Sequence, residues 1–133
     1  MATPGQGRIL VMDDEPMICT LARSFLQRLG YQVEVARDGR EALGLYGQAS
    51  SQGQPFDLVI MDLTVPGGMG GLEAIKLLLE LDPQAKVLVS SGYSNDPVMA
   101  DFKASGFCGV VAKPYKMEDL SRVLQELMRT RTS

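Results

Sequence analysis

The sequence contains no histidine and no tryptophan, and its two cysteines, Cys19 and Cys108, lie far apart without a CxxC spacing. Without histidine the chain has no imidazole that could relay a phosphoryl group, act as a general base or bind a metal ion. The cysteine spacing predicts neither a disulfide framework nor a structural zinc site, and it fits a reducing, cytoplasmic compartment. Any phosphate chemistry must therefore depend on oxygen groups and on lysine.

The sequence also lacks an excess of positive charge and a long apolar segment. The formal net charge is -3 and the pI is about 4.9, whereas direct binding to nucleic acid requires clustered Lys and Arg. No apolar run approaches the roughly 20 residues that a membrane-spanning helix needs, and the first eight residues contain no signal-peptide core. We therefore expect neither direct nucleic-acid binding nor membrane insertion.

The length and composition predict one folded domain. A chain of 133 residues with 45% hydrophobic content is long enough for one core and too short for two domains. With 22% charged residues it lacks the charge imbalance of a disordered protein. We expect the domain to occupy residues 8–129, with flexible ends at residues 1–7 and 130–133.

Short apolar runs and segments with helical periodicity alternate along the chain. The predicted strands are residues 8–12, 33–36, 58–61, 87–89 and 109–112. The predicted helices are residues 16–29, 40–48, 72–81, 97–106 and 118–128. Most of the strand runs are continuous and not alternating, which is typical of strands that are buried on both faces of a parallel sheet.

Two local details accompany this assignment. The first helix is expected to bury a stripe made of Met17, Leu21, Phe25, Leu26 and Leu29. The segment ASSQGQP, residues 49–55, is rich in small and polar residues and predicts a flexible loop.

This order of elements predicts an α/β domain with three layers (αβα), doubly wound around a five-stranded parallel sheet. A Rossmann half-fold would place GxGxxG after the first strand, but the sequence there is MDDEP. We therefore favour the flavodoxin-like strand order 2-1-3-4-5.

Polar residues follow four of the five predicted strands. Asp13 and Asp14 follow the first, Asp62 the third, Ser90 and Ser91 the fourth, and Lys113 the fifth. Because parallel strands end at the same edge of the sheet, these side chains are expected to converge there. Close carboxylates repel one another by up to ~4 kcal/mol per pair at an intermediate dielectric. Mg²⁺, which prefers oxygen ligands and retains waters, would offset that repulsion.

Such a site fits phosphoryl transfer to an aspartate. A carboxylate can act as the nucleophile towards phosphorus, and a metal ion together with a lysine neutralises the charge that develops. Taken separately, the acidic residues could be helix caps, and the serines and the lysine could be ordinary loop residues. Their coincidence at four strand ends favours one shared site.

These residues resemble the site of the response-regulator receiver domain, and the resemblance extends from about Arg8 to Arg129. It implies that Asp62 is the phosphoacceptor. It also implies that Asp14 binds Mg²⁺ directly, that Asp13 does so through water, and that the backbone carbonyl of Thr64 is a further ligand.

The resemblance also assigns the switch hydroxyl and the lysine. Ser91, which precedes the small residue Gly92, matches the switch Ser/Thr better than Ser90 does. Lys113 and Pro114 match the family's lysine-proline pair, whose peptide bond is commonly cis. The side chains of Thr64 and Tyr93 are expected to flank the site and to affect the lifetime of the acyl phosphate by controlling access of water.

Two departures from the family pattern concern signalling. Val110 occupies the position, three residues before the lysine, at which the family often has an aromatic switch residue. The loop after Asp62 has an extra glycine, and its glycines are expected to make it mobile. They are Gly67, Gly68, Gly70 and Gly71.

The stretches MDLTVPGGMGG and VSSGYSNDPVM look most like receivers at the C-terminal end of hybrid sensor histidine kinases. The resemblance therefore implies a histidine kinase, or the kinase core of a hybrid protein, as the phosphoryl donor. A histidine phosphotransfer protein or an output protein is a further expected partner. A stand-alone receiver and an excised domain of a hybrid kinase both fit this sequence.

Three other classes remain open. A haloacid-dehalogenase-like phosphatase would need a second Asp two positions after the nucleophile, where this chain has Thr64. A flavodoxin-like FMN-binding module would not need three carboxylates at a phosphate site. A receiver-shaped scaffold without phosphoryl transfer is the third alternative. We favour a phosphoacceptor that assists its own phosphorylation and dephosphorylation, is not otherwise an enzyme, and has no histidine kinase activity.

Overall fold

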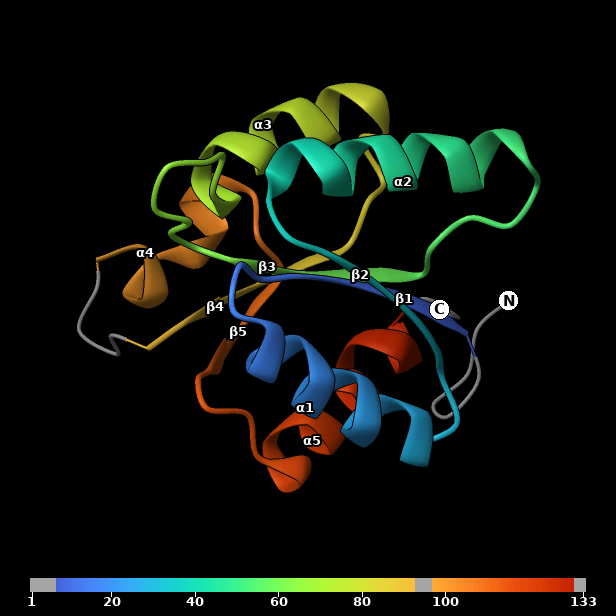
Figure 1. Cartoon of the computed structure of the whole chain (residues 1–133), viewed down its shortest axis with the longest axis vertical. Coiled ribbons are helices and arrows are strands. Elements are labelled where there is room, and N and C mark those ends of the chain that lie inside the picture. The colour runs from blue at the N-terminus through green and yellow to red at the C-terminus, as the bar shows by residue number, and fades with distance from the viewer. Residues whose placement is uncertain (1–6, 93–96, 131–133) are drawn as a thin grey trace.

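The computed structural model describes residues 7–92 and 97–130, with the backbone alone for residues 128–130, and it shows a sheet between two layers of helices (Figure 1). The strands are β1 (Arg8–Met12), β2 (Gln32–Ala36), β3 (Leu58–Asp62), β4 (Val87–Ser91) and β5 (Gly109–Ala112). The helices are α1 (Pro16–Arg28), α2 (Gly39–Ser51), α3 (Gly71–Leu81), α4 (Pro97–Ala100) and α5 (Met117–Thr130), with a 3₁₀ turn at Phe102–Ser105.

The sheet has the order β2-β1-β3-β4-β5 and every pairing is parallel, so the predicted flavodoxin-like fold is confirmed. The central strands β1, β3 and β4 are almost wholly buried, which explains why their sequences are continuous apolar runs. The edge strand β2 alternates between exposed and more buried residues. The position of each of these strands in the sheet, central or at the edge, therefore explains how hydrophobic its sequence is.

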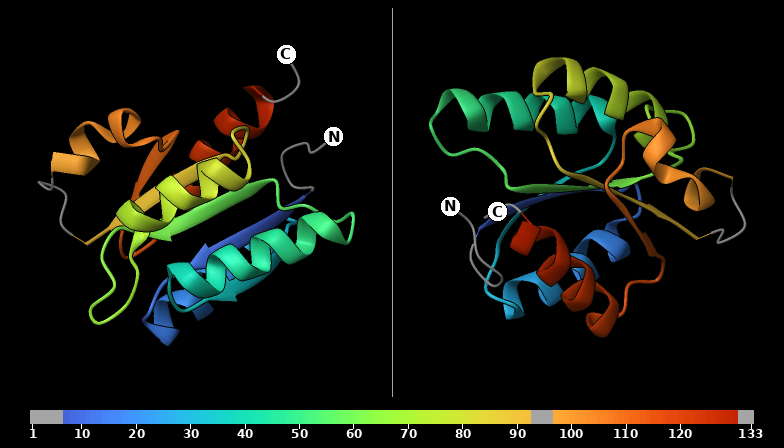
Figure 2. Two further views of the ribbon diagram at one scale, coloured as in Figure 1. Left: turned by 90° about the horizontal axis from the view of Figure 1, so that it is seen from above. Right: turned by 180° about the vertical axis from the view of Figure 1, so that it is seen from behind.

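Helices cover both faces of the sheet, as Figures 1 and 2 show. Helices α1 and α5 cover one face, where Leu26 and Leu124 pack against alternate strand residues such as Val11 and Ile60. Helices α2 and α3 cover the other, where Tyr46 and Ile75 belong to a second buried cluster. Because successive side chains of a strand point to opposite faces, each strand contributes to both cores.

The predicted inner stripe of α1 is wrong at its first residue. Met17 is 83% exposed, whereas Cys19, Ala22 and Leu26 are the buried residues of this helix. Met17 and Cys19 are two positions apart, which is about 200° of helical rotation, so the two side chains point in nearly opposite directions. The thiol of Cys19 also donates to the carbonyl oxygen of Asp13 at 3.3 Å, which ties this face of α1 to the end of β1.

Helix α2 is longer than predicted and includes Ala49 to Ser51, which the sequence analysis assigned to a loop. Ala49 is buried, and this packing extends the helix past its small and polar residues. The start of α2 has a variant of the capping box. The N-cap Asp38 accepts from the Glu41 N–H, and the Glu41 carboxylate accepts from the N–H of Arg37, one residue before the N-cap.

The helix predicted over residues 97–106 is two short elements. The backbone leaves helical geometry at Asp101 (φ -126°, ψ 55°), between α4 and the 3₁₀ turn, and the turn ends at Gly106 with φ 103°. The sequence also predicts an N-cap for this helix at Asn95 or Asp96, before Pro97, and these two residues lie outside the described residues. Among residues 7–92 and 97–130, no helix has the length and apolar character required to cross a bilayer.

An acidic site at the carboxyl edge of the sheet

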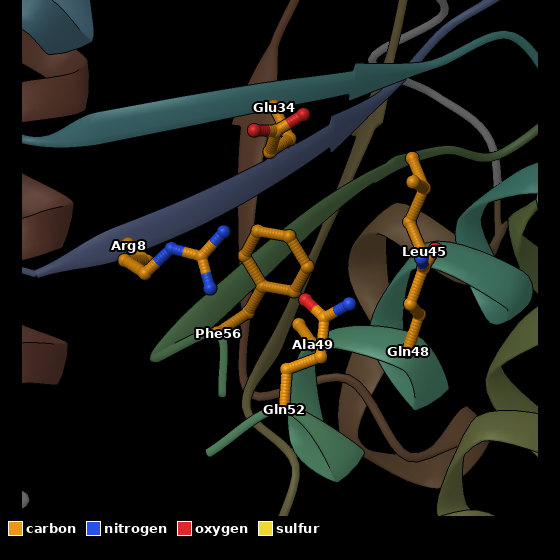
Figure 3. Close-up of a pocket in the computed structure, with 7 residues that line it drawn as sticks. All are labelled: Arg8, Glu34, Leu45, Gln48, Ala49, Gln52 and Phe56. Atoms are coloured by element: carbon orange, nitrogen blue, oxygen red, sulfur yellow. The ribbon is translucent and has the colours of Figure 1, made fainter. Parts of the chain in front are cut away.

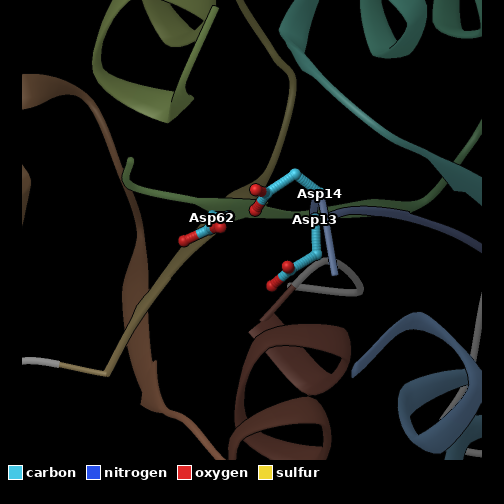
Figure 4. Close-up of side chains that lie close together, drawn as sticks. All are labelled: Asp13, Asp14 and Asp62. Atoms are coloured by element: carbon cyan, nitrogen blue, oxygen red, sulfur yellow. The ribbon is translucent and has the colours of Figure 1, made fainter. Parts of the chain in front are cut away.

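Three carboxylates from the ends of two neighbouring strands lie together at the carboxyl edge of the sheet (Figure 4). Asp13 and Asp14 follow β1, and Asp62 is the last residue of β3. One oxygen from each lies within 4.8 Å of the others. Asp13 and Asp62 are buried and Asp14 is exposed, so the cluster opens to solvent on one side.

Lys113 lies between the two buried carboxylates. Its Nζ is 3.0 Å from Asp13 Oδ2 and 3.3 Å from Asp62 Oδ1, and it is 3.6 Å from Glu15 Oε1 at the rim. The backbone N–H of Lys113 donates to the carbonyl oxygen of Ser91 at 3.1 Å. The Lys113-Pro114 peptide bond is cis. The amine therefore links the ends of β1, β3 and β5.

Asp13 has a second, local role at the start of α1. Its Oδ1 accepts from the Glu15 N–H at 2.9 Å, and its own N–H donates to the carbonyl oxygen of Ala36 at 3.0 Å. The side chain thus forms a turn before Pro16, the first helical residue, while its other oxygen faces Lys113. Asp13 therefore belongs to the turn before α1, whose N-cap is Glu15, and its role in metal binding stays a prediction.

The surroundings of Asp62 and Lys113 shift their titration in the absence of a metal ion. Burial, and then the negative charge of Asp13, raise the pKa of Asp62 from 3.8 to about 6, although Lys113 partly opposes the shift. Burial alone would lower the pKa of Lys113, but the hydrogen bond to Asp13 and the charge of Asp62 raise it above its ordinary value. Lys113 is therefore cationic at neutral pH, and Asp62 is mostly but not entirely ionised.

A surface depression joins the predicted site residues. Its lining is formed by Asp14, Glu15, Asp62, Thr64, Pro66, Ser91, Gly92 and Lys113. Ser91 is buried at the end of β4, and Thr64 is exposed two residues beyond Asp62. Asp13, Asp14, Asp62, Ser91 and Lys113 therefore lie together, as the strand ends predicted, and Thr64 lies beside them.

The remaining predicted positions lie around this cluster. Val110 is half-buried on β5 beside Val89 and packs against the core on the α2 and α3 side. Pro114 is exposed next to Lys113. Tyr93 lies outside the described residues.

Two glycines after Asp62, the N-cap Gly70 and Gly71 at the start of α3, are explained by close packing. A Cβ at Gly70 would lie 2.6 Å from the Leu63 carbonyl oxygen, and one at Gly71 would lie 2.9 Å from the Asp62 carbonyl oxygen. Real Cβ atoms do not approach that closely, so any side chain there would displace the segment that bears Asp62. Gly67, with φ 76°, supplies a left-handed turn in the same loop.

Two residues at the site, Glu15 and Tyr115, were not predicted from the sequence. Glu15 extends the acidic rim towards Lys113, and its position beside the acidic pair was the available signal. Tyr115 is buried below the cluster, and its hydroxyl donates to Ser90 Oγ at 3.0 Å. Nothing in the sequence spacing of Tyr115 and Ser90 predicts their hydrogen bond.

A second hollow lies near the opposite, amino edge of the sheet (Figure 3). Its lining includes Arg8, Glu34, Gln48 and Phe56. The Arg8 guanidinium lies 4.7 Å from the centroid of the Phe56 ring and donates to the carbonyl oxygen of Gln54. Arg8 thus ties the loop before β3 to the start of β1.

A doubly wound parallel sheet with clustered carboxylates and a lysine at its carboxyl edge defines an acidic, oxygen-rich site that fits a phosphoacceptor. The chain belongs to the response regulator receiver domain family, whose sequence profile matches residues 9–125. It is thus a receiver domain of the kind found in two-component systems.

Relatives of very different length support this membership. The chain is 31% identical over 121 residues to chemotaxis protein CheY of Thermotoga maritima, covering 90% of this chain and 93% of that protein. It is 36% identical over 110 residues to the CAI-1 autoinducer sensor kinase/phosphatase CqsS of Vibrio cholerae, covering 80% of this chain but only 15% of that protein. It is 30% identical over 120 residues to the transcriptional regulatory protein ZraR of Escherichia coli, and the match covers 90% of this chain but only 26% of that protein.

Solved structures agree with the fold. Vibrio cholerae chemotaxis protein CheY4 superposes with a TM-score of 0.78 at 31% identity, covering 92% of this chain and 98% of that chain. A response regulator receiver domain protein from Clostridium thermocellum has a TM-score of 0.82 at 22% identity, covering 95% and 97% of the two chains, and shows likeness of fold alone.

Proposed function

We propose that Asp62 accepts a phosphoryl group from a partner histidine kinase and that Mg²⁺ assists the transfer. One observation supports this above the others: the buried Asp62 carboxylate lies within reach of both the Lys113 amine and the acidic pair. Phosphoryl transfer to a carboxylate requires mainly positioning and neutralisation of charge, and these groups supply both.

The donor set fits a magnesium ion. The carboxylates of Asp13, Asp14 and Asp62 offer oxygens within 4.8 Å of one another, and hard cations prefer such ligands. We assign Asp14 and Asp62 as direct ligands, Asp13 as a ligand through water, and the Thr64 backbone carbonyl as a further ligand. When bound, the ion would neutralise charge on the phosphoryl oxygens.

In the transfer step, an Asp62 oxygen attacks the phosphorus of the donor phosphohistidine. The P–O bond forms as the P–N bond breaks, and the electron pair of the broken bond stays on the departing imidazole nitrogen. No general base is needed at neutral pH, because a pKa of about 6 leaves Asp62 mostly ionised. Lys113 remains beside the new phosphoryl group as a cationic hydrogen-bond donor.

The resulting acyl phosphate would act as a switch. It adds about -1.5 to -2 charges next to Lys113, and Ser91 at the end of β4 would move towards it. This shifts the population of the surrounding loops and of the surface formed by α4 and α5. Because Val110 replaces the family's aromatic residue, we propose that the switch does not depend on rotation of a ring at that position. Thr64, Tyr93 and Pro114 would modulate access of water and hence the lifetime of the phosphate.

We further propose residues 8–129 as the functional unit, acting in the cytoplasm. The phosphoryl donor would be a separate histidine kinase or the kinase core of a hybrid protein, a reading favoured by the similarity to CqsS. A histidine phosphotransfer protein or an output protein would receive the signal. In this scheme the chain is a phosphoacceptor without histidine kinase activity and does not act directly on nucleic acid.

The proposal is tested by intact-mass measurement after incubation with Mg²⁺ and acetyl phosphate. We expect the wild type to gain one phosphoryl group, and we expect no gain for Asp62→Asn or with the metal chelated. An equal gain in Asp62→Asn, or no gain in the wild type, would contradict it. Sustained hydrolysis of a generic phosphate ester would instead favour a phosphatase.

A further inference from the structure

A hydrogen-bonded pair of buried hydroxyl groups, from Tyr115 and Ser90, lies beside the acidic site. The Tyr115 hydroxyl donates to Ser90 Oγ at 3.0 Å, with Tyr115 3% exposed and Ser90 fully buried. Ser90 is the strand neighbour of Asp62, and its carbonyl oxygen accepts from the Leu63 N–H. Burial raises the pKa of the Tyr115 phenol, so the hydroxyl stays protonated and remains a donor.

This contact and a backbone hydrogen bond fasten the segment bearing Lys113 to β4. On one side of the lysine side chain, the Lys113 N–H donates to the Ser91 carbonyl oxygen at 3.1 Å. On the other, Tyr115 reaches Ser90 from two residues further along the chain. Lys113 is therefore held between two attachments to consecutive residues of β4.

Packing alone does not require a hydroxyl group at either of these two positions. The Tyr115 ring belongs to the apolar cluster under α1 and α5, and a phenylalanine would fill nearly the same volume. Ser90 continues a strand whose preceding residues Val87, Leu88 and Val89 are all apolar. A buried hydroxyl without a partner destabilises the fold, so the Tyr115 hydroxyl needs the Ser90 oxygen as its acceptor.

We propose that Tyr115 and Ser90 are positioning residues that fix the Lys113 amine relative to Asp62 during phosphoryl transfer. This inference rests on the proposed function. A lysine side chain has several rotatable bonds, so a fixed backbone narrows the range of positions that its amine can reach. An error of about 1 Å in the position of a reacting group can slow a reaction by up to about 100-fold.

The test uses Tyr115→Phe, Ser90→Ala and the double variant in the full chain. The rate of phosphorylation is measured by intact mass at saturating Mg²⁺ over a range of acetyl phosphate concentrations. We expect each single substitution to lower the maximal rate about threefold to tenfold, with the donor concentration for half-maximal rate unchanged. The double variant should be no slower than the slower single variant, because both substitutions break one link.

Stability separates positioning from support of the fold. Ser90→Ala leaves the Tyr115 hydroxyl without its acceptor, whereas the double variant removes both polar groups and should recover thermal stability. If the pair acts by positioning, the double variant recovers its thermal stability but its rate of phosphorylation stays low. Tyr46→Phe is the matched control, since the Tyr46 hydroxyl donates to Asp82 Oδ2 at 2.6 Å on the other side of the sheet. It should lower the melting temperature without slowing phosphorylation.

Three results would overturn the inference: wild-type rates in both single variants, recovery of the rate together with stability in the double variant, or equal slowing by Tyr46→Phe. In each of these the wild type still gains a phosphoryl group. Failure of the wild type to do so contradicts the proposed function itself, so the two failures are distinguishable.

Discussion

The two edges of the sheet use charged residues in opposite ways. At the amino edge, the Arg8 guanidinium stacks on Phe56 and donates to a backbone carbonyl, while the Asp57 carboxylate accepts from the Arg8 N–H at 2.9 Å. At the carboxyl edge, Lys113 faces the carboxylates of Asp13, Asp62 and Glu15. Both charged side chains of the first set contact neutral groups of the fold, namely a ring, a carbonyl oxygen and a backbone N–H. The second has an excess of negative charge that a cation can relieve, and this imbalance distinguishes a reactive site from a structural one.

The largest expected effect comes from removing the cation of the carboxyl edge. Lys113→Ala should slow phosphorylation by acetyl phosphate about 100-fold, because the transition state loses a positioned cationic donor. Lys116→Ala is the matched control, since Lys116 is exposed and lies three residues further along the same segment. It should react at the wild-type rate in the intact-mass assay. Wild-type phosphorylation of Lys113→Ala would remove the distinction between the two edges.

The pH dependence of stability gives a second test of the excess negative charge. In metal-free protein the pKa of Asp62 rises from 3.8 to about 6 on folding, so the native state binds the proton more tightly than the unfolded chain. The contribution of Asp62 to stability is therefore lost as the pH increases from about 4 to about 6. Asn at this position does not titrate. We expect Asp62→Asn to match the wild type near pH 4 and to be more stable by up to about 3 kcal/mol near pH 7.5.

Urea denaturation in the presence of a chelator measures this difference. The sign of the stability difference between Asp62→Asn and the wild type is informative, because removing one residue of a structural ion pair would destabilise the protein at neutral pH. If Asp62→Asn is less stable than the wild type near pH 7.5 without metal, the burial of an excess carboxylate is not what distinguishes this edge.

Much of this contrast follows from the sequence, and the reasons are local. The apolar runs at β1 and β5 predicted the bounds of these strands, because a strand buried in a parallel sheet needs continuous apolar residues. Asp13, Asp62 and Lys113 were predicted to meet, because strand ends of a parallel sheet share one edge.

What the sequence did not predict depends on the direction of side chains across elements. In α1, Met17 was expected inside because apolar residues are too frequent there to fix the phase of the helix, and packing against the sheet selects Cys19 and Ala22. The Tyr115 to Ser90 hydrogen bond joins residues 25 positions apart through the interior. Neither residue type is unusual at its position, so no pattern in the sequence signals the contact.

Magnesium should produce a smaller change in stability, confined to the carboxyl edge. At a concentration near 100 times its dissociation constant, a ligand that binds only the folded state stabilises it by about 2.7 kcal/mol. We expect Mg²⁺ to raise the melting temperature of the wild type and to have much less effect on Asp14→Asn and Asp62→Asn. An equal shift in all three proteins would place metal binding elsewhere.

The smallest expected effect is at the amino edge, where Arg8→Ala removes the stacking on Phe56 and the hydrogen bond to Gln54. A cation–π contact at a partly exposed site and one hydrogen bond each contribute about 0.5–1 kcal/mol, so urea denaturation should report a loss of about 1–2 kcal/mol. The Arg8 N–H to Asp57 hydrogen bond is made by the backbone and remains. Because Arg8 and Lys113 lie at opposite edges, phosphorylation and the response to Mg²⁺ should be unchanged. A rate reduced as much as in Lys113→Ala would mean that the two edges are coupled through the sheet, and the amino-edge charges would then belong to the signalling machinery.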